Sequence, residues 1–159
     1  MATLPQLIEE DISRLDDQLK ELLQKSDATT ALIIDKGGFL ITSKGDADQF
    51  DLTTIAALAS GAYLANQTIA QLVHETQFNS VYQQGQKFSM FVVSVDEFCL
   101  LVVIFRAQLS VGLVKYFAAP CATHIAKQLK AAQDREPGAG LDLSELNLMD
   151  PSEVFKRKV

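Results

Sequence analysis

The chain has 159 residues, a net charge of −6 and a hydrophobic content of 48%, enough for one folded domain that needs neither disulfides nor a metal. The acidic balance makes nucleic acid a poor partner. Two cysteines, Cys99 and Cys121, lie in apolar stretches. We expect buried thiols rather than a disulfide framework, and therefore a cytoplasmic protein.

No targeting or membrane segment is expected. The N-terminal residues 1–20 are rich in acids, where a signal peptide needs a basic start and an apolar run. Residues 88–105 approach the length that spans a membrane, but Asp96 and Glu97 lie near the middle. Because charges are costly in lipid, we expect two strands joined by a turn and no membrane insertion.

The first half of the chain predicts a helix, a hairpin and a second helix. Leucine and isoleucine recur at helical spacing over residues 4–23, which indicates an amphipathic helix. β-rich runs at 31–34 and 39–42 flank the sequence Asp-Lys-Gly-Gly, whose two glycines can supply the positive φ angles of a tight hairpin. Asp51 is a suitable N-cap for a helix over residues 52–73.

The second half predicts three strands and a third helix. Residues 78–83 and 87–95 flank a turn, and the apolar run 98–105 is typical of a central strand buried on both faces. Apolar residues then recur at helical spacing from Ser110 to about residue 132. Pro120 interrupts this pattern, so we expect a kink or two abutting helices there.

The predicted order is therefore α-β-β-α-β-β-β-α. It indicates an α+β domain, with one mostly antiparallel five-stranded sheet flanked by helices, over residues 1–135. Residues 136–159 are expected to form a linker and a C-terminal tail. Asp150, followed by a proline, can begin a short helix in that tail.

The helix predicted at residues 52–73 is apolar on nearly every side. Such a helix must be covered on two sides, and small residues allow a second helix to approach closely. We expect a second subunit to cover one side; the alternative is a core within one chain. The predicted homodimer interface combines this helix with the neighbouring strand: Ile55, Ala59, Ala62, Tyr63, Asn66, Ile69, Phe78, Val81 and Tyr82.

The tail contains apolar residues that could bind a partner. The candidates are Leu146, Met149, Val154 and Phe155. The alternative is a segment that folds back onto its own domain or stays disordered.

No residue pattern predicts catalysis, a cofactor or a metal. The chain lacks a phosphate-binding glycine-rich loop, and the acidic residues between 46 and 51 lack the further ligands of a calcium loop. His74 and His124 have no zinc-type spacing with the cysteines. Cys121 and His124 are three residues apart on one predicted helix, which is a weak basis for an enzyme site.

The chain resembles the roadblock/dynein light-chain domain family over residues 4–132. The resemblance rests on the element order and on four segments: ALIIDKGGFLIT, LTTIAALASGAYLANQTIAQLV, CLLVVIF and SVGLVKYFAAP. Within that family the chain is most similar to the bacterial MglB type. These stand-alone domains act on a small Ras-like GTPase of the MglA type.

The resemblance implies a homodimer in which central helices pack together and edge strands extend one sheet. It also implies activation or modulation of the GTPase, in some bacteria for cell polarity and gliding motility. The GTPase would supply its own catalytic residues, so this protein would not itself be an enzyme. None of the four arginines is identified as an arginine finger: Arg14, Arg106, Arg135 and Arg157. The alternative is a non-catalytic dimeric scaffold that tethers complexes.

Overall fold

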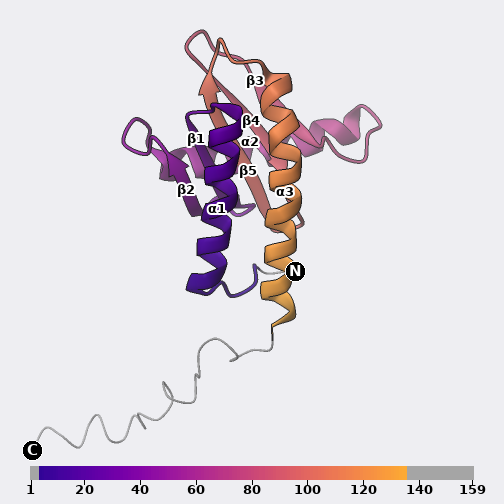
Figure 1. Ribbon diagram of the computed structural model, residues 1–159. Helices are drawn as coiled ribbons and strands as arrows, with labels where there is room; N and C mark the ends of the chain where they lie inside the picture. Colours follow the sequence, from indigo (N-terminus) through magenta and orange to yellow (C-terminus); the bar gives the residue numbers. More distant parts are fainter. Residues whose placement is uncertain (1–3, 136–159) are drawn as a thin grey trace, which may run out of the picture.

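The computed structural model describes residues 4–135 (Figure 1). Eight elements follow in the predicted order, which confirms the fold class. They are α1 (Glu9–Ser26), β1 (Thr30–Asp35), β2 (Leu40–Gly45), α2 (Leu52–Leu72), β3 (Ser80–Gln83), β4 (Phe88–Ser94), β5 (Cys99–Arg106) and α3 (Val111–Asp134). The linker, tail and short helix predicted for residues 136–159 lie outside the described residues.

All five strands form one antiparallel sheet in the order β2-β1-β5-β4-β3. The central strand β5 is buried on both faces from Cys99 to Phe105, as predicted. Helices α1 and α3 lie side by side over one face of the sheet, and α2 lies over the other (Figure 1). The core therefore has two layers, one on each side of the sheet.

Helix α1 begins at Glu9, five residues later than Leu4, where the sequence pattern predicted its start. The backbone N–H of Ile8 donates to the Asp11 carboxylate at 2.9 Å, which marks Ile8 as the N-cap. Leu4 packs against the core without being helical. It precedes Pro5, and a residue before proline is disfavoured in the helical conformation.

Asp11 is a buried carboxylate that joins the start of α1 to the end of α3. Besides the Ile8 N–H, it accepts hydrogen bonds from Gln128 at 2.8 Å and from the Arg135 guanidinium at 2.9 and 3.0 Å. Hydrogen bonding to Arg135 lowers the pKa of this carboxyl to about 2, against the desolvating effect of burial. The two helices are thus tied together where the described part of the chain ends.

The β1–β2 hairpin differs in detail from its prediction. Only Gly38, at φ 100°, has the positive φ predicted for both glycines; Gly37 does not. The Asp35 carboxylate accepts a hydrogen bond from the Phe39 N–H at 2.9 Å, and this bond helps to close the turn. One residue with a positive φ is therefore enough to form this turn.

Helix α3 is a single helix through Pro120, so of the two predicted alternatives, a kink or two abutting helices, the second is wrong. Proline removes the N–H that would donate to the carbonyl of Tyr116. Both residues are exposed, so water can take the place of the missing donor. Among the described residues, no helix is both long and apolar enough to cross a bilayer.

Candidate partner-binding surface

Helix α2 has apolar residues on its inner and outer sides. Its inner residues Leu52, Ala56, Ala59 and Tyr63 are buried against the sheet. Five large apolar side chains of α2 and its C-cap expose 47% to 75% of their surface: Leu58, Leu64, Ile69, Leu72 and Val73. The sequence predicted that this helix must be covered on two sides. In the single chain the sheet covers the inner side, and the outer side is exposed.

A side-chain hydrogen bond ties the middle of α2 to the β1–β2 turn, and both ends of the helix are capped locally. The Asp51 side chain accepts from the Thr54 N–H at 3.2 Å, as the predicted N-cap. The Ser60 hydroxyl donates to the Lys36 carbonyl at 2.6 Å. Beyond the C-cap, His74 has a left-handed conformation at φ 64°, a common way to end a helix.

The predicted dimer-interface residues do not all lie on one surface. Ala59 and Tyr63 are only 4% exposed and contact the chain's own sheet. The half-buried members are Ile55, Asn66, Phe78 and Val81, and the exposed members are Ala62, Ile69 and Tyr82. The interface stays a prediction, but Ala59 and Tyr63 offer almost no surface to a second subunit.

Four of the five exposed apolar residues of α2 and its C-cap were missing from the predicted interface: Leu58, Leu64, Leu72 and Val73. Helical periodicity finds two apolar sides of α2 but does not say which one the sheet takes. Leu58 and Leu64 are each adjacent in sequence to a predicted interface residue, and Leu72 lies one helical turn beyond Ile69. The apolar pattern was present in the sequence, but it did not show which side of α2 meets the sheet.

Strand β3 is an edge of the sheet. It pairs with β4 alone, so the other edge of Ser80–Gln83 is unpaired among the described residues. Just before the strand, the Gln67 amide of α2 both donates to the Phe78 carbonyl and accepts from the Phe78 N–H, each at 3.1 Å. Gln67 therefore fixes α2 beside the start of β3 and satisfies the backbone of Phe78. Sequence analysis missed this role.

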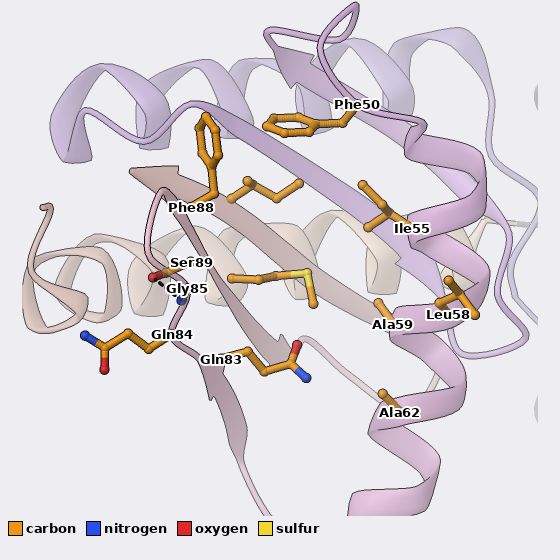
Figure 2. Close-up of a pocket in the computed structure, with 12 residues that line it drawn as sticks. Phe50, Ile55, Leu58, Ala59, Ala62, Gln83, Gln84, Gly85, Phe88 and Ser89 are labelled. Carbon is orange, nitrogen blue, oxygen red and sulfur yellow. Dashed lines mark hydrogen bonds between the residues drawn. The ribbon is translucent and has the colours of Figure 1, made fainter. Parts of the chain in front are cut away.

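A groove of about 500 Å³ separates α2 from the β3–β4 turn (Figure 2). Ile55, Leu58 and Ala62 line it from α2, and Phe88 and Met90 line it from β4. Figure 2 shows Ile55 and Ala62 pointing from α2 toward the strands. The groove is predominantly apolar, which suits a buried apolar side chain of a partner.

Aromatic rings close one end of the groove. Phe50 and Phe88 meet edge to face, with ring centroids 5.2 Å apart. The Arg106 guanidinium lies 6.0 Å from the centre of the Phe88 ring. At the β3–β4 turn the Gly85 N–H donates to the Ser89 hydroxyl at 3.3 Å. A Cβ at Gly85 would lie 2.1 Å from the Phe88 carbonyl oxygen, so the turn requires glycine.

The described arginines have different surroundings. Arg14 forms an ion pair with Glu10 at 2.7 Å, and Arg135 is held by Asp11. Arg106 is exposed, and among the described arginines it alone has no ion pair. It is therefore the described arginine that is best placed to meet a partner, although the sequence alone did not distinguish it.

The cysteines and histidines do not form a site together. Cys99 and Cys121 are buried free thiols, as predicted, and burial raises the pKa of each to about 12. The Cys121 thiol donates to the Gln18 carbonyl at 3.6 Å, while His124 Nδ1 lies 3.1 Å from Gln18 Oε1. Within residues 4–135, no cluster of three or more potential metal ligands occurs.

These features define an α+β domain with an open apolar helix side, an adjacent groove and a free sheet edge. Residues 14–105 match the Roadblock/LC7 domain model. Because this match covers more than half of the chain, the protein belongs to the roadblock/LC7 family. The family predicted from the sequence is thereby confirmed.

Three solved structures described as MglB are similar to this chain. One is MglB with a tetrameric arrangement, at a TM-score of 0.77 and 27% identity, covering 83% of this chain and 99% of that one. The gliding protein MglB from Thermus thermophilus has a TM-score of 0.76, 27% identity and coverage of 82% and 99%. Myxococcus xanthus MglB has a TM-score of 0.76, 26% identity and coverage of 83% and 99%. No curated protein sequence matches the chain.

Proposed function

We propose that this protein is a homodimeric, MglB-like regulator of a small Ras-like GTPase of the MglA type. The observation that carries the proposal is the outer side of α2, where Leu58, Leu64 and Leu72 are more than half exposed. The likeness to MglB structures supports the choice of a GTPase as partner. The proposed site of action is the cytoplasm.

The proposed dimer uses the outer side of α2 together with the free edge of β3. Pairing two copies of Ser80–Gln83 would continue the sheet across the molecules and satisfy edge backbone groups. The same contact would cover Ile69 and Leu72, which are 47% and 75% exposed. Burial of apolar area provides the free energy, at about 25 cal/mol per Å².

The proposed GTPase contact is a surface that the dimer builds around the α2 groove. Its apolar lining suits an apolar side chain of the GTPase, and Arg106 at the closed end suits a neighbouring carboxylate or phosphate. Four residues of the C-terminal tail are further proposed GTPase contacts: Leu146, Met149, Val154 and Phe155. On this proposal the GTPase performs hydrolysis and this protein adjusts its switch regions.

Single-turnover GTP hydrolysis by the cognate GTPase, with and without this protein, tests the proposal. We expect faster hydrolysis with the wild type and a reduced effect with Leu58→Glu, which puts a charge into the groove. Phe39→Glu is a matched control, because Phe39 is also highly exposed, at 73%, but lies at the β1–β2 hairpin. We expect the control to act like the wild type.

The outcomes separate the two candidate functions. Binding with an unchanged rate of hydrolysis would replace GTPase activation by a scaffold function, in which the dimer tethers complexes. The absence of both binding and rate change would refute the GTPase proposal altogether.

A further inference from the structure

The outer side of α3 carries a second surface that the proposed function does not use. Residues spaced three and four apart place one exposed stripe along this helix, on the side away from the sheet. Leu113 and Tyr116, at its N-terminal end, are 40% and 73% exposed. Lys127 and Lys130 follow at its C-terminal end, so the stripe is apolar at one end and basic at the other.

Neither lysine at the basic end of the stripe forms an ion pair with a described residue. Between Phe98 and Gln133 the chain has no acidic residue and four basic ones. Asp134 is the one acid of α3. Among the described residues, α1 and α3 are joined by a single ion pair, that of Asp11 with Arg135. A shallow pocket of about 310 Å³ between these helices has Lys127 in its wall, together with Arg14 and Asp17 of α1.

The C-terminal sequence combines acidic and apolar side chains that could meet both ends of this stripe. Residues 136–155 contain five acidic side chains and no basic one. Asp142 and Glu145 lie among leucines, and the later apolar residues Leu148, Met149 and Phe155 flank two further acids. If this segment turns back along α3, its acids meet the lysines and its apolar residues meet Tyr116 and Leu113.

The length of the segment permits this arrangement. From Arg135 back to Tyr116 the helix spans about 28 Å, at 1.5 Å per residue. From Arg135 forward to Leu148, an extended chain covers about 43 Å at 3.3 Å per residue. Because Asp11 fixes Arg135 against α1, the segment starts from a defined point at the basic end of the stripe.

We propose that residues 141–155 dock in cis along this outer stripe of α3 when no other protein occupies them. The docked segment pairs its acids with Lys127 and Lys130 and covers Tyr116 with apolar side chains. In this position the tail is withheld from other partners, so the stripe serves as its resting site. The proposal does not depend on a GTPase.

A fluorescent probe on the tail of the full chain tests the proposal. Ser152→Cys provides one reactive thiol, because Cys99 and Cys121 are buried. We expect the fluorescence anisotropy of a maleimide dye at this position to be well above that of the same dye on a free peptide 136–159. Tyr116→Glu should lower it, whereas Phe39→Glu, equally exposed at 73%, should leave it unchanged.

A charge exchange separates docking from a local effect of one substitution. Lys127→Glu with Lys130→Glu should lower the anisotropy, and adding Asp142→Lys with Glu145→Lys should restore it. Wild-type anisotropy equal to the peptide value would overturn the proposal. Equal responses of Tyr116→Glu and Phe39→Glu would also overturn it. All measurements are made without a GTPase, so they stand apart from the hydrolysis assay.

Discussion

One face of the sheet is covered by two helices and the other by one. Over the first, α1 and α3 pack side by side, and residues such as Leu15, Leu19, Ile125 and Leu129 are completely buried. Over the second, α2 leaves a groove beside the β3–β4 turn and exposes its own outer leucines. The closed face supplies stability, and the open face supplies the apolar surface that we propose for binding. Substitutions on the two faces should therefore have different consequences.

The largest effect is expected inside the closed face. Leu19→Ala removes a side chain that is 0% exposed between α1 and the sheet, and should cost about 3 kcal/mol of unfolding free energy. Urea unfolding at one protein concentration measures this loss. The neighbouring Lys20→Ala is the control, because Lys20 is exposed and its loss should stay under about 0.5 kcal/mol. Equal losses for the two variants would contradict the conclusion that the closed face provides the stability of the fold.

A smaller effect is expected at the ion pair between Asp11 and Arg135, which joins α1 to α3 at the end of the closed face. The pKa of Asp11 is lowered from 3.8 to about 2 in the folded protein, which corresponds to about 2.5 kcal/mol at neutral pH. Because the folded pKa lies below the unfolded one, this stability is fully present above about pH 4 and is lost as the pH falls toward 2.

Asp11→Asn should therefore lower the unfolding free energy at pH 7 by about 2 kcal/mol and remove much of its decline between pH 4 and 2. Unfolding curves across this pH range measure both changes. Asp17→Asn, at an exposed position of the same helix, should keep the wild-type pH profile. A wild-type profile for Asp11→Asn would show that the pair does not stabilise the fold.

The smallest effect on stability, but a change of assembly, is expected on the open face. Ile69→Asp changes an outer residue of α2 that is 47% exposed, and should alter the stability of the isolated chain by less than about 0.5 kcal/mol. Sedimentation should nevertheless shift from dimer mass to the chain mass of 17.4 kDa. Thr53→Asp puts the same charge at an exposed position of α2 and should remain dimeric. Wild-type protein at 17.4 kDa would contradict the dimer.

The element order could be predicted because each element has its own local pattern. β5 is continuously apolar, and the hairpins have turn glycines and polar linkers. The two sides of α2 could not be assigned in the same way, because both are apolar and a period of 3.6 does not indicate which one meets the sheet. Ala59 and Tyr63 were therefore grouped with residues on the outside.

Contacts between distant residues were beyond local patterns. Asp11 looks like one more acid in the first turn of a helix, yet its partner Arg135 is 124 positions away. Gln67 is an ordinary polar residue of α2 in the sequence, and its bonds to Phe78 depend on where β3 begins. The groove likewise requires the packing angle between α2 and the sheet, which no single segment encodes.

The short free edge of β3 also affects how the protein behaves at high concentration. An unpaired strand invites open-ended growth of sheets, which leads to aggregation. Here the edge is only four residues long, and Gln67 occupies the backbone groups of Phe78 next to it. At the opposite edge, the β1–β2 pairing is interrupted by a register shift, and β2 ends in Lys44 and Gly45. Both ends of the sheet are thus poor templates for runaway polymerisation, which favours a closed assembly over fibres.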